Sequence, residues 1–287
     1  MAADRRRNAA APPTGAARRY RTLRLLARYF RVNLAANTAY PVPFAIQVVA
    51  MAANNAMFLA FWAILFEAID APIAGYTFTD VMFLWAVAAA GFGLGAVVCG
   101  NSGHLSRIIY RGDLDVYLAQ PKPVLPNLLA SRMSVSSWGD LLYGLGLFAV
   151  SQPLTGASIG LFLLFVLLAA GVLVAVRVLY HSLTFLLGNA EDLAGVGSEQ
   201  IITFSLYPGT IFDGPLVAVI LHTLIPAALV AHLPADLFRA VVRGTGMDWG
   251  LLAIIVAGDA ALIAAAWALF ALGLRRYESG NRIGARI

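Results

Sequence analysis

The stretch ASIGLFLLFVLLAAGVLVAVRVLYHSLTFLL, residues 157–187, contains one charged residue, Arg177. A helix needs about 20 apolar residues to cross the hydrocarbon core of a bilayer, and this run is longer than that. Strands of a membrane barrel would instead alternate in polarity over segments of about ten residues. A continuous run rich in Leu, Val, Ala and Gly therefore predicts a transmembrane helix.

The composition of the whole chain also indicates a membrane environment. The 287 residues are 60% hydrophobic and 12% charged, whereas a soluble domain carries about 25% charged residues. The predicted fold class is all-α, a polytopic membrane protein with six transmembrane helices over residues 41–274. Besides 157–187, the expected spans are 42–66, 80–102, 128–151, 250–274 and a short one near 198–212.

The region before the last span, residues 199–234, is apolar but interrupted. Pro208, the Asp213-Gly214-Pro215 turn and Pro226 all oppose a single straight helix, because proline removes a backbone donor and clashes with the preceding turn. After the short span we expect a broken or re-entrant pair of helices over about 214–234. Such breaks are tolerated at membrane depth where protein shields the backbone.

The basic residues predict the orientation of the chain. Residues 1–40 hold nine Lys and Arg, the 103–132 loop holds four, and the C-terminus holds four, whereas 67–79 and 152–156 hold none. The positive-inside rule then places both termini and the 103–132 loop in the cytoplasm, so that residues 275–287 form a cytoplasmic tail. The net charge of +5 is explained by this topology, and we expect no nucleic-acid partner.

The N-terminal region divides into a tail and an amphipathic helix. Residues 1–17 lack the apolar core of a signal peptide and are expected to form a flexible tail. Residues 18–40 predict a helix in the membrane interface that contacts lipid, although a solvated helix of a small soluble module would show a similar pattern. Its apolar stripe is Tyr20, Leu23, Ala27, Phe30 and Leu34, and the expected membrane-interface arginines are Arg21, Arg24, Arg28 and Arg31.

Several kinds of chemistry are not expected in this chain. The only lysine, Lys122, lies in QPKPV and not at the end of a glycine-rich phosphate loop, so ATP hydrolysis would require a separate subunit. The four histidines show no metal-ligand spacing, and the single cysteine, Cys99, excludes an internal disulfide. We therefore expect no enzyme activity, no cofactor and no metal in this chain.

One enzyme motif and two packing motifs are present. GNSGH, residues 100–104, matches the Gly-x-Ser-Gly pattern of rhomboid-like intramembrane serine proteases, with Ser102 as nucleophile and His181 as a possible base. Such a protease, or a membrane scaffold without transport activity, is the alternative to a transporter. The glycine pairs 91/95 and 156/160 have the four-residue spacing that allows close packing of membrane helices.

Polar residues inside predicted spans are energetically costly and therefore informative. They are explained either by hydrogen bonds between helices or by a translocation path or subunit interface, and the sequence leaves both open. The residues are Asn54, Asn55, Asp140, Arg177, His181, His222 and Asp259.

The segment IIYRGDLDVYLAQPKPVLPNLL, residues 108–129, is the most polar stretch in the middle of the chain. It predicts a short helix along the cytoplasmic surface, followed by a rigid elbow, because its three prolines prevent the helix from continuing into the next span. A simple connection would need only a few residues. The excess length of this loop, about 103–127, and its mixed charge indicate a docking element.

GDLDVYLAQPKPVLPNLL, residues 112–129, resembles the Gly-x-Leu-Asp-x-x-Leu-x-x-Pro segment of type-2, exporter-class membrane subunits of ATP-binding-cassette transporters. LYPGTIFDGPLVAVILHTLIPAALVAHLPADLF (206–238) and LRRYESGNRI (274–283) are similar to an uncharacterised bacterial subgroup of these permeases. AQPKP and YESGN depart from the usual pattern, so the sequence does not say which of two paired sister permeases this chain is.

The resemblance implies a permease of a bacterial cytoplasmic membrane that exports its substrate by alternating access. It would pair with itself or a sister permease, above two ATPase subunits that bind ATP and Mg. The first cytoplasmic loop would be the coupling helix inserted into the ATPase. The residues carried over to that role are Arg107, Arg111, Gly112, Asp113, Leu114, Asp115 and Leu118.

Overall fold

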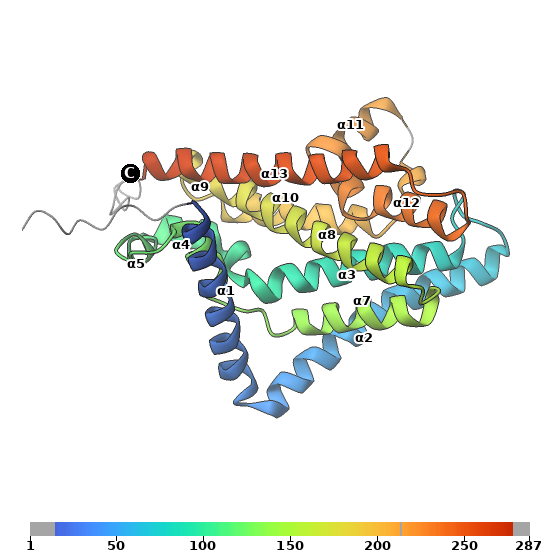
Figure 1. The fold of residues 1–287 in the computed structure, drawn as a ribbon, viewed down its shortest axis with the longest axis horizontal. Coiled ribbons are helices and arrows are strands. Elements are labelled where there is room, and N and C mark those ends of the chain that lie inside the picture. The colour runs from blue at the N-terminus through green and yellow to red at the C-terminus, as the bar shows by residue number, and fades with distance from the viewer. Residues whose placement is uncertain (1–14, 213, 278–287) are drawn as a thin grey trace, which may run out of the picture.

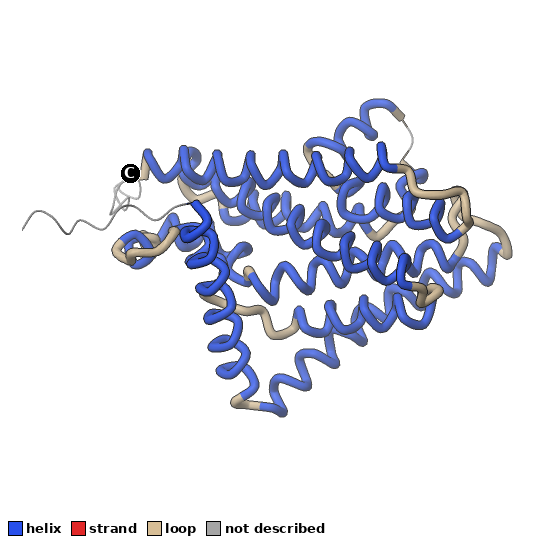
Figure 2. Tube along the Cα trace, in the orientation of Figure 1, coloured by secondary structure: helices blue, strands red, loops and turns tan. Residues whose placement is uncertain are grey.

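The computed structural model of the protein describes residues 15–212 and 214–277, without the side chains of 15–21, 218 and 222. The described residues are helical and contain no β-strand, which confirms the predicted all-α fold class. The helices that pack side by side form a bundle (Figures 1 and 2). Among them are α3 (Phe78–Val98), α7 (Ser137–Ser151), α8 (Gly156–Ser182), α10 (Glu191–Ser205) and α13 (Trp249–Arg275).

Four helices are long and apolar enough to cross a membrane. These are α2 (Pro41–Ile69), α3, α8 with its continuation through α9 (Thr184–Leu187), and α13. Helices α7 and α10 have 15 residues each, which at 1.5 Å per residue is about 22 Å and less than the hydrocarbon thickness. The chain is thus a multi-pass membrane protein, and the count of six crossings stays a prediction.

The prediction of one continuous span over 128–151 is wrong. Helix α6 (Val124–Ala130) ends before residues 131–136, which are not helical, and α7 then begins at Ser137. The segment 131–136 has the sequence SRMSVS, and serine hydroxyls compete with the backbone for helical hydrogen bonds. Two backbone hydrogen bonds fix it to the end of α3, from Gly100 N to Arg132 O (3.0 Å) and from Ser134 N to Ala96 O (3.1 Å).

Helix α3 lies at the centre of the bundle, and an aromatic cluster surrounds it. The Phe83 ring stacks on Phe238 with centroids 3.8 Å apart, and Phe148 stacks on Phe162 at 4.0 Å. Phe83 also contacts Phe148 edge to face. These four rings come from α3, α12 (Leu233–Val242), α7 and α8, so one cluster joins four helices in the core.

Small residues bring α3 against its neighbours. A Cβ added at Gly91 would lie 2.6 Å from Ala169 Cβ on α8, and one added at Gly95 would lie 3.2 Å from the Val174 side chain. The predicted packing role of this glycine pair is confirmed. A Cβ added at Gly156 or Gly160 would contact no atom of another described helix within 4 Å, so the same prediction is wrong for them within this chain.

The interrupted region before the last span consists of short elements. Helix α10 begins at Glu191, earlier than predicted, and is followed by the 3-10 turn η2 (Gly209–Ile211). Helix α11 (Pro215–Thr223), a π-helical turn η3 (Ala228–His232) and α12 (Leu233–Val242) complete it. Breaks therefore fall near the prolines, because proline cannot donate the helical hydrogen bond. A re-entrant path through a membrane stays a prediction.

The polar contacts at the two ends of the bundle are different. At the end where α3 begins, Arg239 pairs with Asp236 and lies over the Tyr76 ring at 4.1 Å, while Arg243 pairs with Asp80 at 3.3 Å. At the other end lie the turns between α3 and α6 and the end of α13. The first end is closed by an ion-pair network that the sequence did not predict.

Helix α1 (Gly15–Thr38) stands apart from the bundle, beside the end that holds α4 (Leu105–Arg111) and α5 (Asp115–Leu118) (Figure 1). Leu23 of the predicted apolar stripe is 65% exposed, whereas Phe30 packs against Trp138 with ring centroids 6.2 Å apart. One side of α1 thus contacts the protein. Arg24, Arg28 and Arg31 are exposed, the Arg21 side chain lies outside the described residues, and the location of α1 in a membrane interface stays a prediction.

The contact between α3 and α7 gives a direct test of the packing. A Cβ at Gly144 would lie 2.6 Å from Ala86 O and from Ala90 N, both backbone atoms that cannot move independently. We expect Gly144→Ala to destabilise the protein by about 1–3 kcal/mol through overpacking. The measurement is the midpoint of thermal unfolding of the detergent-solubilised protein.

Gly146→Ala is the matched control, since Gly146 is on the same helix and has nothing within 4 Å. Its midpoint should stay equal or rise slightly, because alanine is the better helix former. Equal midpoints for the two variants would contradict the close approach of α3 and α7.

Candidate functional site

The polar segment after α3 folds into two short helices joined by a glycine. Helix α4 (Leu105–Arg111) ends at Gly112, whose φ of 82° lies in the left-handed region that favours glycine, and α5 (Asp115–Leu118) follows. We call residues 105–118 the elbow. It is anchored by Leu105, Ile109 and Leu114, which are buried in one apolar cluster with residues of α6, α8 and α13.

The opposite side of the elbow is exposed and combines apolar and charged groups. Arg111 and Asp113 are exposed beside Val116, which is 62% exposed, and Leu118, which is 41% exposed. We call the exposed side chains of the elbow the docking face; they are Arg107, Tyr110, Arg111, Asp113, Val116 and Leu118. Asp115 is half-buried and Leu114 is fully buried, so these two predicted coupling residues are less accessible to a partner.

Polar contacts connect the elbow to the bundle. Arg107 Nη2 lies 2.5 Å from Glu191 Oε1 at the start of α10, and this bond lowers the pKa of the Glu191 carboxyl. Ser106 Oγ lies 2.7 Å from His181 Nδ1 on α8. Burial, with the nearby Asp115 carboxylate, raises the pKa of Tyr277, beyond α13, to about 12. A displacement of the elbow would therefore reach α8, α10 and the end of α13.

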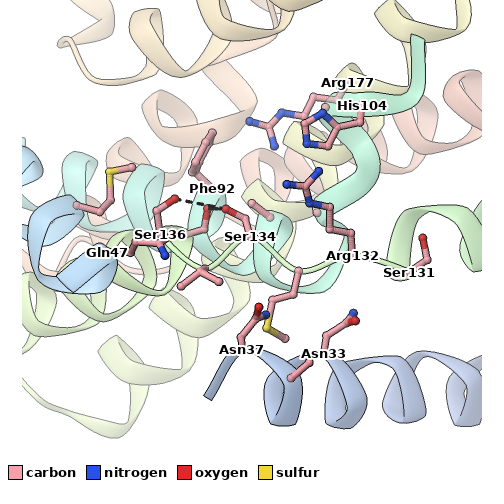
Figure 3. A pocket seen from close by; sticks show the side chains of 18 residues that line it. Asn33, Asn37, Gln47, Phe92, His104, Ser131, Arg132, Ser134, Ser136 and Arg177 are labelled. Carbon is pink, nitrogen blue, oxygen red and sulfur yellow. Dashed lines mark hydrogen bonds between the residues drawn. The ribbon is translucent and has the colours of Figure 1, made fainter. Parts of the chain in front are cut away.

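Next to the elbow lies a polar cavity of about 560 Å³ (Figure 3). Its walls come from α1, from the start of α2, from the end of α3 with the 3-10 turn η1 (Gly100–His104), from the segment 131–136 and from Arg177 of α8. In Figure 3, Arg132, His104 and Arg177 lie on one side, and Asn33 and Asn37 of α1 lie across from them.

The charged residues that line this cavity are all basic. Arg132 and Arg177 line it, and its described lining contains no Asp or Glu. The Arg177 guanidinium lies over the Phe92 ring at 4.6 Å. Burial, with the nearby Arg132 and Arg107 charges, lowers the pKa of His104. These observations indicate a positive potential inside the cavity.

Hydroxyl groups and a helix start complete the lining. Ser137 donates to Ser134 Oγ at 2.8 Å, and the Ser134 and Ser136 hydroxyls lie 3.5 Å apart (Figure 3). Helix α7 begins at Ser137, and no side chain caps its first turn. The positive end of the helix dipole thus lies at the cavity, while the Trp138 and Gly139 N–H groups donate to Val135 O and Ser136 O.

Helix α1 forms the remaining wall and is held by few polar contacts. Tyr29 donates from its hydroxyl to Asn127 Oδ1 on α6 at 2.6 Å, and Asn33 Nδ2 donates to Ala130 O at 3.0 Å. Lys122 lies with its ammonium 5.4 Å from the Tyr29 ring centroid. The wall is therefore tied to α6 and to the loop before it, which follow the elbow in the chain.

The structure places the predicted intramembrane polar residues at separate positions. Asn55 Nδ2 donates to Asp140 Oδ1 at 2.7 Å and joins α2 to α7. Arg177 lines the cavity, whereas His181 is buried against Ser106. For the whole predicted set, a role in a translocation path or subunit interface stays a prediction. Of the other three, Asn54 is exposed on α2, Asp259 is buried in α13 without a described hydrogen-bond partner, and the His222 side chain lies outside the described residues.

The serine of the protease-like motif is not paired with a base. Ser102 is fully buried, and its hydroxyl has no hydrogen-bond partner among the described residues. His181, the base considered from the sequence, instead contacts Ser106. The arrangement required for an activated serine nucleophile is therefore not formed in this structure.

Sequence reasoning did not predict the cavity itself. Arg132, Ser134 and Ser136 were placed in a loop and at the start of a continuous span, because the apolar residues after them dominate the pattern. The available signal was the serine-rich stretch SRMSVSS, residues 131–137, at the start of that span. The sequence pattern of α1 indicates only its arginines and its apolar stripe, so it does not identify Asn33 and Asn37 as cavity residues.

The helical bundle with four membrane-length helices defines a multi-pass membrane protein. The family described as ABC-2 family transporter protein matches residues 52–281. The chain belongs to this family, the membrane permeases of ATP-binding-cassette transporters, and the predicted resemblance is confirmed. No curated protein matches the chain, and no solved structure does. Within the described residues, no group of three or more His, Cys, Asp or Glu could hold a metal ion.

The attachment of α1 leads to a prediction. Asn127 is fully buried and accepts from Tyr29, so Tyr29→Phe would leave its carbonyl oxygen without this donor. An unsatisfied buried polar group costs about 1–3 kcal/mol. We expect a lower thermal unfolding midpoint and faster trypsin cleavage at the arginines of α1 in detergent.

Tyr40→Phe serves as the control, because Tyr40 follows α1 and is 73% exposed. It should leave both readouts unchanged. If Tyr29→Phe behaved like this control, the bond to Asn127 would not hold α1 in place.

Proposed function

We propose that this chain is the transmembrane permease subunit of an ATP-driven exporter, powered by a separate ATPase that binds ATP and Mg. The proposal places it in the cytoplasmic membrane of a bacterium, with both termini and the elbow on the cytoplasmic side. Exposed basic residues at the elbow end support that orientation. They are Arg111, Lys122, Arg275 and Arg276.

The docking face is the observation that carries this proposal. It presents exposed apolar side chains, Val116 and Leu118, between charges of both signs, Arg111 and Asp113, at one end of the bundle. Protein interfaces commonly combine an apolar centre with a polar rim. The buried Leu105, Ile109 and Leu114 make the elbow a rigid part of the bundle, so force applied by a partner would be passed on and not absorbed.

The contacts of the elbow supply a route for that force. Through Ser106 and His181 it is joined to α8, and through Arg107 and Glu191 to α10. We infer that ATP-driven movement of the partner tilts these helices against α3 and opens a path alternately to each side. Closely packed helices shift between discrete arrangements and do not deform continuously.

A second permease, identical or sister, is the other proposed partner. Helix α2 is almost entirely uncovered in the single chain, with Met57 71% exposed and Phe58 56% exposed. Asn54 lies exposed on the same helix, and an amide in contact with lipid is costly, whereas across a helix interface it can form hydrogen bonds. This supports α2 as part of the subunit interface.

The docking face can be tested by pull-down from the native membrane. We expect Val116→Asp to lower recovery of a co-purifying ATPase by at least about tenfold, because it places a charge in an apolar contact. The ATPase is detected by mass spectrometry and by ATP hydrolysis in the eluate. Leu154→Asp, an exposed change in the loop before α8, should retain it.

Three outcomes would count against the ATPase-coupled permease. They are recovery of no ATPase with the unmodified chain, equal recovery with both variants, and a proteolytic activity lost only in Ser102→Ala. The last would favour the protease alternative, and the first would favour a scaffold without transport activity.

The subunit interface leads to a separate prediction. Two differently tagged copies should co-purify in mild detergent, and Asn54→Leu should reduce the recovered partner, because an interhelical hydrogen bond in a membrane contributes about 1 kcal/mol. Thr38→Val is the control, since the Thr38 hydroxyl is bonded to Leu34 O of its own helix. If Asn54→Leu and the control gave equal recovery, Asn54 would not be at the interface. Absence of any co-purification would leave only a sister-permease heterodimer.

A further inference from the structure

The polar cavity beside the elbow has the properties of an anion-binding site. Arg132 and Arg177 both line it, and neither forms an ion pair with an acidic side chain in the described part of the chain. Glu199 and Asp140 interact with Arg177 electrostatically but make no such pair. Arg132 is exposed and Arg177 is half-buried, and the repulsion between two guanidinium groups that share one cavity without an ion pair is a cost for the empty cavity. An anionic ligand would remove that cost.

The remaining groups of the lining are suited to a phosphate. Guanidinium groups bind phosphate oxygens through two parallel hydrogen bonds. The hydroxyls of Ser134 and Ser136 add donors, and the start of α7 adds the positive end of its helix dipole. Asn33 and Asn37 of α1 face them across the cavity. Anion recognition thus draws on five separate elements: α1, η1, the segment 131–136, the α7 start and α8.

The position of the cavity favours a ligand that comes from the membrane. One wall is α1, whose Arg24, Arg28 and Arg31 are exposed and whose Leu23 and Val32 are exposed apolar residues. Such a helix attracts anionic headgroups. Arg177 lies in the half of the span Gly156–Leu187 that leads to the elbow end of the bundle, so the cavity is on the elbow side of this span. The volume of about 560 Å³ is in the range of small-molecule sites.

We propose that this cavity binds the phosphate group of an anionic amphiphile that enters from the adjoining membrane leaflet past α1. Arg132 and Arg177 hold the phosphate oxygens, while the serine hydroxyls and the α7 N-terminus complete the site. As a statement about cargo, the inference rests on the proposed function. Binding of the amphiphile to the isolated chain needs no ATPase, so the binding experiment and the ATPase pull-down can give independent results.

Native mass spectrometry of the detergent-purified chain tests the proposal, with dioleoylphosphatidylglycerol as the probe and dioleoylphosphatidylcholine as the zwitterionic comparison. We expect one retained phosphatidylglycerol with clear preference over phosphatidylcholine. Arg132→Gln and Arg177→Gln should each weaken retention at least about tenfold, because each removes a charge-assisted hydrogen bond of about 1.5–3 kcal/mol. Arg275→Gln removes an exposed cation at the same end, outside the cavity, and should retain the lipid.

Two further variants keep the test valid if Arg177→Gln fails to fold. Arg177→Lys preserves the charge but not the planar fork, so retention should fall less than with glutamine. Ser136→Asp places a carboxylate in the cavity beside the arginines and should abolish retention. The unfolding midpoint of each variant identifies those that fold.

Glycerol 3-phosphate distinguishes the source of the phosphate. If it displaces phosphatidylglycerol at comparable concentration, the site binds soluble phosphate esters, and the leaflet route is overturned. If only the lipid competes, the membrane source is supported. Equal retention of the two lipids, or equal retention by Arg132→Gln, Arg177→Gln and Arg275→Gln, would overturn the anion site altogether.

Discussion

The backbone connection between the end of α3 and the segment 131–136 is the constraint on which both functional regions depend. Gly100 N donates to Arg132 O and Ser134 N donates to Ala96 O. A Cβ at Gly100 would lie 2.7 Å from Arg132 O, so this approach requires glycine. This approach holds Arg132, Ser134 and Ser136 beside η1, where they line the cavity, and it determines where the elbow begins after α3. A continuous helix over 128–151 would remove both the cavity and this placement of the elbow.

The elbow and the cavity share η1, which connects them covalently. His104, the last residue of η1, lines the cavity, and α4 begins at the next residue. Arg107 then forms its ion pair with Glu191 within the first turns of α4. A rotation of α4 by an ATPase would therefore shift His104 relative to Arg132 and Arg177. The proposed ATPase contact and the proposed ligand site are thus joined by a few residues of η1 and α4.

The sequence predicted the parts of this fold that depend on long apolar runs. The four membrane-length helices, the all-α class and the Gly91/Gly95 packing follow from hydropathy and small-residue spacing, which are local properties. The break at 131–136 and the aromatic cluster did not follow. Both depend on contacts between distant segments, such as Ser134 with Ala96 and Phe83 with Phe238. Likewise, Arg177 was recognised as an unusual residue, but its neighbours Arg132 and Asn33 come from other helices.

The distribution of charge differs between the two ends of the bundle. This difference indicates why the elbow end is suited to a conformational change and the end where α3 begins is suited to remain rigid. Asp80, Asp236, Arg239 and Arg243 neutralise one another at the end where α3 begins, and a satisfied network of this kind rigidifies its surroundings. At the elbow end, Arg132 and Arg177 form no ion pair with an acidic side chain among the described residues, although Glu199 and Asp140 act on Arg177 electrostatically. Guanidinium groups without an ion pair can be satisfied by a ligand in one conformation and by water in another. The energetic difference between the two conformations would then depend on what occupies the cavity, which is the requirement for coupling a bound molecule to movement.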